Sequence, residues 1–361
     1  MTVRRRRRPV RPGADAGLWH SLPMAAPRVT IAQVAAEAGV SAMTVSNVMN
    51  GRPGASEATR LRVLGMAERL GYQPSHSARS LRSGRTGLIG IVSLDLTSEY
   101  SHEIVRGIAE VFADDERELL INVSVDAIRE RERIQFFARD IVDGVLLIAP
   151  ALEPETVEMI PSLRTPVVVI DPRQLGVNLP KVTVDNYEGM RAATEHLVGL
   201  GHRRIAFIRG EQDLDSTAER HRGYLDGMRL AGLEVEEDLT VDSSFSHAGG
   251  LRAAKALLER APTAIIAGAD LIAIGAIDAA RARGMAVPED LSVIGFDDIP
   301  RAAQTYPPLT TVRQPLHGMG EAGARAILSL IEERPLAVEH IRLPTTLVIR
   351  ASTAPPPTGR L

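Results

Sequence analysis

The chain contains no cysteine among its 361 residues, which excludes a disulfide framework and a thiolate metal site. No apolar run approaches the roughly 20 residues that a membrane-spanning helix needs, so we expect no membrane partner. Lysine is nearly absent, with 2 lysines against 40 arginines, and we interpret this imbalance as genomic composition bias. The missing cysteines are compatible with a reducing cytoplasm, and 44% hydrophobic residues indicate a globular chain.

Familiar catalytic motifs are missing as well. The sequence has no nucleophile elbow of the form GxSxG, no phosphate-binding P-loop and no motif of metal-ligating residues. The nine histidines are scattered, and His196 and His202 are six residues apart, which does not place them on one helical face. We therefore expect no enzyme, no metal site and no cofactor.

Positive charge is concentrated at one end of the chain. Residues 1–85 hold 14 arginines and 4 acidic residues, a balance of +10, whereas the remainder carries a balance of −13. The net charge of −3 conceals this asymmetry. A basic head on an acidic body is typical of a nucleic-acid-binding module joined to a body with another task.

The first 27 residues combine an unbroken arginine run with several prolines and glycines. Such a composition cannot bury a core, so we predict a disordered basic extension over residues 1–27 that adds non-specific phosphate affinity. No apolar segment follows the arginines, which argues against a secretory signal. The favoured interpretation is an over-long gene start, with translation beginning at Met24.

A helix-turn-helix is indicated by the stretch TIAQVAAEAGVSAMTVSNVMNG. Ala35 is small enough for close helix packing, Gly39 can take a positive φ at the turn, and Val45 fills the space between the helices. Thr30 and Ser41 stand at the two N-cap positions. An ordinary helical hairpin would share this spacing, but the segments that follow favour a DNA-binding head.

A third helix is predicted over SEATRLRVLGMAERLGY, which completes a head over residues 28–72. Its apolar stripe consists of Leu61, Leu64, Ala67 and Leu70. Residues 73–87 are predicted either as a flexible linker or as a hinge helix that folds on DNA and inserts Leu81 into a minor-groove step. The second helix would read base edges in the major groove. The candidate DNA-binding residues are Thr30, Ser41, Ala42, Met43, Thr44, Ser46, Asn47, Asn50, Ala78, Arg79 and Leu81.

From Leu88 onward, short apolar runs alternate with amphipathic helices in two rounds. The runs include LIGIVSLDL, LLINVSV, GVLLIAP and PVVVID in the first round, and RRIAFIRG, TAIIAG and DLSVIGFDD in the second. This α/β alternation predicts parallel sheets with helices on both faces, arranged as two Rossmann-like lobes over residues 88–350 with a cleft between them. The helix GMGEAGARAILSLIEE is assigned to the second round, IRLPTTLVIR is predicted as one last strand, and residues 351–361 are predicted as a disordered tail.

With head, hinge and two-lobed body in view, the chain resembles the LacI/GalR family of transcriptional repressors. The resemblance covers residues 29–350, and its motifs are VTIAQVAAEAGVSAMTVSNVMNG, ARSLRSGRTGLIGIV, HLVGLGHRRIAFI, VPEDLSVIGFDDIP and PPLTTVRQP. It implies a periplasmic-binding-protein-like body and a homodimer whose heads read a pseudo-palindromic operator. It also implies a small-molecule effector, most often a sugar, between the lobes, and a bacterial, cytoplasmic, nucleoid-associated protein.

Ligands of open α/β sheets bind beyond the carboxyl ends of the strands, where this chain carries several acidic residues. Carboxylates there can accept hydrogen bonds from sugar hydroxyls, although an N-cap or loop hydrogen bond is the structural alternative for each. The resemblance adds Arg220 as the cleft arginine and Phe245 as an aromatic that stacks on the ligand. The candidate effector-binding residues are Asp95, Tyr100, Asp171, Arg220, Phe245, Asp270 and Asp297.

Three departures from the family's pattern concern specificity. Asn47 stands where many members carry arginine, and asparagine pairs with adenine where arginine prefers guanine. Ala269 and Asp270 replace a common Asn-Asp pair, which removes one amide from the ligand's surroundings. The stretch SLDLTSEYSHE replaces a more usual Asp-Leu-x-Asn-Pro-Phe-Phe, with Tyr100 in place of one aromatic.

We therefore expect a sequence-specific DNA-binding transcriptional regulator, a repressor, whose operator affinity is controlled by a sugar. The ligand would shift the hinge equilibrium by its differential affinity for two lobe arrangements. The alternative is a ligand-binding module or a sugar-processing enzyme of the same two-lobed fold without operator function. The proline-rich tail shows no heptad helix of the kind the family's tetramers can use, so a dimer is expected.

Overall fold

The computed structural model describes residues 29–72, 85–93, 95–124, 126–174, 176 and 178–357. The chain divides into two units, Met1–Ser83 and Gly84–Leu361, which we call the head and the body. Ala78, Arg79 and Leu81 of the predicted hinge lie outside the described residues, as does the predicted basic extension. Within the described part of the chain, no helix is long and apolar enough to cross a membrane.

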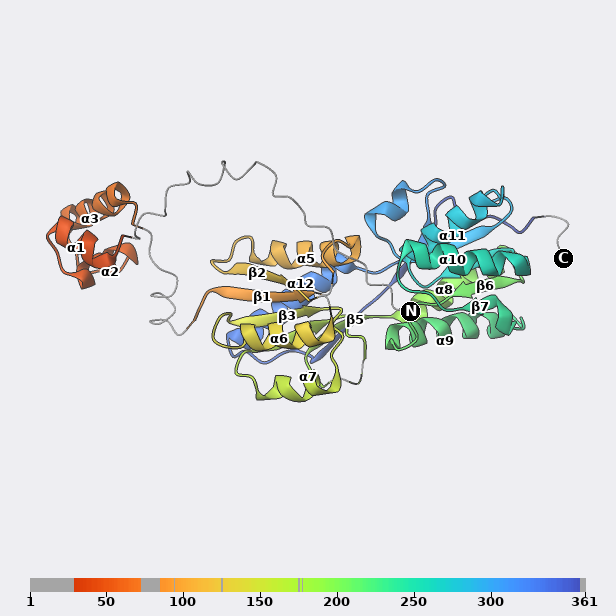
Figure 1. The fold of residues 1–361 in the computed structure, drawn as a ribbon, viewed down its shortest axis with the longest axis horizontal. Coiled ribbons are helices and arrows are strands. Elements are labelled where there is room, and N and C mark those ends of the chain that lie inside the picture. The colour runs from red at the N-terminus through yellow and green to blue at the C-terminus, as the bar shows by residue number, and fades with distance from the viewer. Residues whose placement is uncertain are drawn as a thin grey trace, which may run out of the picture. The chain divides into compact units, whose positions relative to one another are not determined.

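Three helices make up the head (Figure 1). They are α1 (Ile31–Ala38), α2 (Ala42–Met49) and α3 (Glu57–Leu70). Thr30 and Gln33 form a capping box at the start of α1, and Gly39 ends that helix with a φ of 64°. The hydroxyl of Ser41 accepts the backbone N–H of Thr44 at 3.1 Å and so caps α2. These features confirm the predicted helix-turn-helix spacing.

Apolar side chains from all three helices meet in the core of the head. Val45 and Val63 have no exposed surface there, which confirms Val45 as a packing residue. The predicted apolar stripe of α3 was wrong in part, because Leu61 and Leu64 are 64% and 41% exposed. Val63 and Ala67, one turn apart, are the buried residues of α3, so Ala67 is the member of the predicted stripe that is buried.

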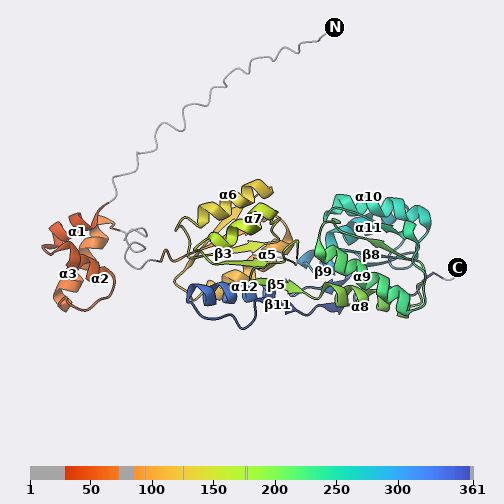
Figure 2. The ribbon, with the colours of Figure 1, turned by 90° about the horizontal axis from the view of Figure 1, so that it is seen from below.

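A parallel six-stranded sheet in the order β11-β5-β4-β3-β1-β2 forms the first lobe of the body. Its strands are β1 (Leu88–Ser93), β2 (Glu118–Val123), β3 (Gly144–Ile148), β4 (Val167–Ile170), β5 (Lys181–Val184) and β11 (His340–Leu343). Two helices cover each face (Figures 1 and 2). They are α5 (Glu99–Phe112) with α12 (Leu316–Ile331) on one face, and α6 (Ala127–Phe137) with α7 (Pro154–Met159) on the other.

The second lobe repeats this plan on a six-stranded sheet in the order β12-β10-β9-β8-β6-β7, in which only the β10–β12 pairing is antiparallel. Its strands are β6 (Ile205–Ile208), β7 (Thr240–Val241), β8 (Ala264–Ala267), β9 (Ser292–Asp297), β10 (Thr310–Arg313) and β12 (Thr346–Val348). Its helices are α8 (Asn186–Gly199) with α9 (Asp215–Leu230), and α10 (His247–Leu257) with α11 (Asp270–Ala282). Short 3-10 helices are η1 (Ile160–Ser162), η2 (Glu237–Leu239), η3 (Leu258–Arg260) and η4 (Pro300–Gln304).

Central strands such as β3 and β9 are buried along their whole length. Because helices cover both faces of a parallel sheet, such strands are apolar throughout rather than alternating. The predicted parallel sheets with helices on both faces are therefore confirmed. The strand β7 was not predicted because it has only two residues, and β5, whose sequence KVTV begins with a charged residue, was missed as well.

The chain passes between the two lobes three times, after β5, after β10 and after β11. The single last strand predicted over IRLPTTLVIR was therefore wrong, since β11 joins the first sheet and β12 the second. Pro344 lies between these two strands and has no backbone N–H, so it cannot donate a hydrogen bond to a neighbouring strand. The assignment of α12 to the second lobe was wrong for the same reason, because α12 packs against α5 in the first.

The segment after Arg350 is anchored to the second lobe. Ser352 is completely buried, its hydroxyl accepts the N–H of Thr310 at 2.8 Å and it donates to the carbonyl oxygen of Val293 at 2.6 Å. The backbone N–H of Val293 in turn donates to the Ser352 carbonyl oxygen at 2.8 Å. The predicted disordered tail was thus wrong for residues 351–357.

Candidate functional site

The predicted DNA-reading surface lies on α2 of the head. Met43 is 67% exposed and Ala42 is exposed, while Thr44 and Asn47 are half-buried. Ser46 is 5% exposed and shares the inward face of the helix with Val45, and its contact with bases stays a prediction.

Three further candidates of the head are exposed but engaged within it. Thr30 and Ser41 use their hydroxyls as helix caps. Asn50 donates its side-chain amide to the carbonyl oxygen of Ser46 at 2.6 Å. Their contacts with DNA stay predictions, as do those of Ala78, Arg79 and Leu81 outside the described residues.

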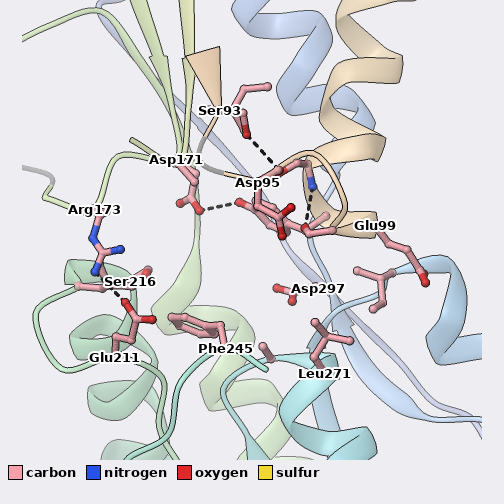
Figure 3. Close-up of a pocket in the computed structure, with 18 of the residues that line it drawn as sticks. Ser93, Asp95, Glu99, Asp171, Arg173, Glu211, Ser216, Phe245, Leu271 and Asp297 are labelled. Atoms are coloured by element: carbon pink, nitrogen blue, oxygen red, sulfur yellow. Dashed lines mark hydrogen bonds and ion pairs between the residues drawn. The ribbon is translucent and has the colours of Figure 1, made fainter. Parts of the chain in front are cut away.

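A cavity of about 480 Å³ lies in the body, where the carboxyl ends of strands from both lobes face each other (Figure 3). Its charged lining residues are Asp95, Glu99, Asp171, Arg173, Glu211, Arg220, Asp297 and Arg301. Its larger apolar and aromatic lining residues are Tyr100, Ile148, Leu214, Phe245, Leu271 and Ile299. The cavity is thus of a size and a mixed chemistry suited to a small polar molecule.

Sharp turns at strand ends aim residues into this cavity. Ala149, Asp171 and Asp297 come at the ends of β3, β4 and β9 with φ values of 46°, 54° and 119°. Such positive φ values are uncommon for residues with a side chain and occur often at binding sites. Asp171 and Asp297 lie at the carboxyl ends of strands, as predicted, and both line the cavity.

Asp171 and Tyr100 form a pair within the first lobe. The phenol of Tyr100 donates to Asp171 Oδ2 at 2.5 Å. Burial raises the pKa of Asp171, although the Tyr100 hydrogen bond and the charge of Arg220 act in the opposite direction. Burial and the neighbouring Asp171 raise the pKa of Tyr100 well above its usual value, so the phenol stays a donor.

Arg220 enters the cavity from α9 and is 4% exposed. Its Nε donates to the Asn186 side-chain oxygen at 2.8 Å and its Nη1 to the Gly268 carbonyl oxygen at 2.5 Å. The guanidinium carbon lies 3.8 Å from the ring centroid of Phe296, a cation–π geometry. The guanidinium is therefore fixed in place before any ligand arrives.

Asp297 lies opposite this arginine, with 3.9 Å between Asp297 Oδ1 and Arg220 Nη1. The same oxygen accepts the side-chain amide of Gln314 at 2.6 Å. Burial raises the pKa of Asp297 to about 7, against the lowering effects of Arg220 and Gln314. The carboxyl group can therefore exchange its proton near neutral pH.

Phe245 supplies the aromatic surface of the second lobe (Figure 3). A Cβ atom on Gly210 would come within 2.0 Å of the Phe245 ring, so the ring packs directly on the Gly210 backbone. Glycine at position 210 is thus what allows the ring to hold this position.

Two of the predicted carboxylates have structural partners. Asp95 lines the cavity and accepts the N–H of Thr97 at 2.7 Å, a turn-forming bond. Asp270 is completely buried and does not line the cavity, so its predicted ligand contact is contradicted. It braces the second lobe instead, accepting from the Thr311 hydroxyl at 2.5 Å and from the Ile299 N–H at 2.9 Å.

Two charged pairs that the sequence analysis missed join the lobes at the cavity. Arg173 of the first lobe lies 2.7 Å from Glu211 of the second. Glu99 at the start of α5 lies 3.0 Å from the Arg301 side chain and also accepts the Arg301 backbone N–H at 2.9 Å. Arg173 and Glu211 each come three residues or fewer after a strand, which is the signal that could have identified them. Arg209 also follows a strand directly, but it pairs with Asp242 and does not line the cavity.

One group of described side chains has metal-ligand spacing. Glu110, His317 and Glu321 bring one ligand atom each within 4.8 Å of one another on α5 and α12. Glu110 and His317 are 2.9 Å apart and form an ion pair when the histidine is protonated. His317 also lies 3.6 Å from Glu321, so these surface groups serve as partners for one another.

A helix-turn-helix head and a two-lobed body with a charged cavity define a DNA-binding protein that also binds a small molecule. The model for bacterial regulatory proteins of the lacI family matches residues 30–75, and the model for a periplasmic binding protein-like domain matches residues 194–353. The regulator RegA of Clostridium saccharobutylicum is 35% identical to this chain, and the match covers 90% of this chain and 99% of RegA. The ribose operon repressor of Halalkalibacterium halodurans is 34% identical, and the match covers 90% of this chain and 97% of that repressor. The chain belongs to the LacI family of DNA-binding transcriptional regulators.

Solved structures agree with this assignment. A complex of the transcriptional regulator CelR with cellobiose has a TM-score of 0.69 and 34% identity, over 90% of this chain and 100% of that one. The Lac repressor dimer bound to operator and the anti-inducer ONPF has a TM-score of 0.82 and 25% identity, over 91% and 100%. The relatives named here are regulators rather than enzymes, which favours the regulatory function over the alternative considered from the sequence.

Proposed function

We propose that a sugar bound in the cavity controls the operator affinity of this chain. Asp171, Asp297 and Arg220 would bind the sugar's hydroxyls, and Phe245 would stack on its apolar ring face. The observation that carries the proposal is that these groups, fixed on different elements of both lobes, surround one cavity. Their conformations are held by protein partners, so a ligand would pay little ordering entropy on binding.

The relatives support a sugar as the effector class. CelR has been solved with cellobiose, and a LacI-family regulator from Enterococcus faecium with bound ribose. A LacI-type ligand acts by preferring one of two lobe arrangements, and its effect on DNA affinity equals that preference. Both lobes contribute residues to this cavity, so a bound ligand would change the equilibrium between open and closed arrangements of the lobes.

The DNA side of the proposal concerns the head and its dimer. A homodimer would place two α2 helices on a pseudo-palindromic operator, with Met43 and Asn47 among the base-reading side chains. A head over residues 28–72, a hinge over 73–87 inserting Leu81, and a body from residue 88 complete this arrangement. Repression from a cytoplasmic, nucleoid-bound position is the mode of action we propose for this DNA-binding family member.

Operator selection from random DNA tests the proposal, using protein that starts at Met24 and a panel that includes cellobiose and ribose. We expect one palindrome to enrich and its recovery to change with one sugar. Arg220→Met should keep the palindrome but lose the sugar response, while Arg204→Met, which alters a surface arginine paired with Glu236, should keep both. Enrichment that no sugar changes would contradict the effector proposal and leave the DNA function intact.

A further inference from the structure

The charges around the cavity indicate which sugars it accepts. Five carboxyl groups and three guanidiniums line it, and burial favours the neutral form of two of the five, Asp171 and Asp297, by raising their pKa. From how the arginines are paired within the protein, we infer that the effector is an uncharged sugar and that the cavity rejects phosphorylated and carboxylated sugars. This inference rests on the proposed sugar-binding function and specifies its ligand class.

All three cavity arginines already have partners in the protein. Arg173 Nη2 lies 2.7 Å from Glu211 Oε2 and 3.1 Å from Asp213 Oδ2. The Arg301 side chain lies 3.0 Å from Glu99 Oε1. A phosphate at either guanidinium would therefore lie beside a carboxylate that already shares the positive charge, and the two anions would repel each other.

The third arginine is even less available to an anion. Arg220 donates to the Asn186 side chain and to the Gly268 carbonyl oxygen, and it lies 3.9 Å from Asp297. A ligand phosphate here would lose its hydration in a buried site and would find a guanidinium that already serves two protein acceptors. A neutral hydroxyl, in contrast, can donate to Asp297 and accept from the guanidinium at the same time.

The carboxyl groups of the lining offer acceptor oxygens to a ligand. Asp171 takes one hydrogen bond from Tyr100 on Oδ2, and a carboxylate can accept several. Carboxylate oxygens that seek donors match the vicinal hydroxyls of a sugar, and each added ligand charge of the same sign weakens binding. The pairing of Arg173 and Arg301 across the lobes is thus the specificity determinant.

Calorimetry on the full chain tests the inference with matched neutral and anionic probes. The pairs are glucose with glucose 6-phosphate, ribose with ribose 5-phosphate, and glucose with glucuronate, with cellobiose as a further neutral probe. We expect the neutral member to bind about tenfold or more tightly than its anionic partner. An anionic probe that binds as tightly as its neutral partner would overturn the inference while leaving the sugar proposal standing. Failure of every probe to bind would contradict the sugar proposal itself.

A double variant tests the role of the paired arginine directly. Glu211→Gln with Asp213→Asn removes both carboxylates from Arg173 without altering side-chain size, so glucose 6-phosphate should gain about tenfold in affinity relative to glucose. Glu236→Gln with Asp238→Asn makes the same charge change at two ion pairs outside the cavity and should leave the ratio unchanged. An equal gain in both double variants would show a general charge effect and overturn the role of Arg173.

Discussion

Asp297 combines three constraints that rarely meet at one residue. It ends β9 with a φ of 119°, it is 8% exposed, and its carboxyl group faces Arg220 without a close ion-pair contact. Burial disfavours the charged form more than Arg220 and Gln314 favour it, which is why the pKa of this carboxyl rises to about 7. A group in this state costs stability when it ionises, and the structure retains it at the ligand cavity.

The raised pKa of Asp297 predicts a pH-dependent stability. The folded state holds this proton up to about pH 7, whereas the unfolded state releases it near pH 4, so the contribution is complete at low pH and lost as pH rises between these values. Asp297→Asn removes the ionisation and keeps an acceptor for Gln314. The gain in unfolding free energy over the parent should therefore be about 2 kcal/mol larger at pH 8 than at pH 5.

Urea unfolding of both proteins at the two pH values measures this difference. Asp238→Asn, which changes an exposed carboxylate paired with Arg260, serves as the matched control and should show no comparable pH dependence. A gain for Asp297→Asn that is equal at both pH values would show that the carboxyl does not titrate in this window.

Some cavity residues could be predicted from the sequence and others could not. Asp171 and Asp297 come at the carboxyl ends of apolar strands, and the strand-end rule is enough to predict that both face one cavity. Asp270 has the same local signal, but its partners Thr311 and Ile299 come from elsewhere in the second lobe and turn it into a brace. Contacts of this kind are set by tertiary packing, which local sequence does not encode.

At the scale of elements, α5 and α12 of the first lobe pack so closely that a side chain would not fit at two glycine positions of their contact. A Cβ on Gly107 of α5 would lie 2.0 Å from the carbonyl oxygen of His317, and one on Gly320 of α12 would lie 2.1 Å from that of Ile104. The obstructing atoms are backbone atoms, which cannot rotate away as a side chain can. The two helices therefore pack at a distance that only glycine allows at these positions.

Gly107→Ala should consequently destabilise the body by about 1–3 kcal/mol through overpacking. The control is Gly199→Ala in α8, where the added methyl group meets nothing within 4 Å. Because alanine favours the helix over glycine, the control should be neutral or stabilise by up to about 1 kcal/mol. Urea midpoints of the two variants would show the difference, and equal midpoints would mean that α5 and α12 separate freely.

At the scale of the whole molecule, the sequence predicted the class of fold but not the path of the chain. Apolar strands alternating with helices are enough to indicate two α/β lobes, because burial on both faces makes the signal local. The sheet that a strand joins depends on distant partners, so β11, β12 and α12 were misassigned. The head was predicted well because capping and turn residues act within a few positions of the backbone they fix.

The anchored C-terminal segment leads to a prediction about the whole body. A chain that ends at Arg350 loses the hydrogen bonds of Ser352 and Ala354 to the second lobe, whereas a chain that ends at Pro357 keeps them. Each such bond contributes about 1 kcal/mol net, so the shorter chain should lose at least about 3 kcal/mol of unfolding free energy and the longer one almost none. Thermal and urea unfolding of the body would measure both. If the chain ending at Arg350 is as stable as the full chain, the segment is a passive tail, and the second lobe is closed by β10 and β12 alone.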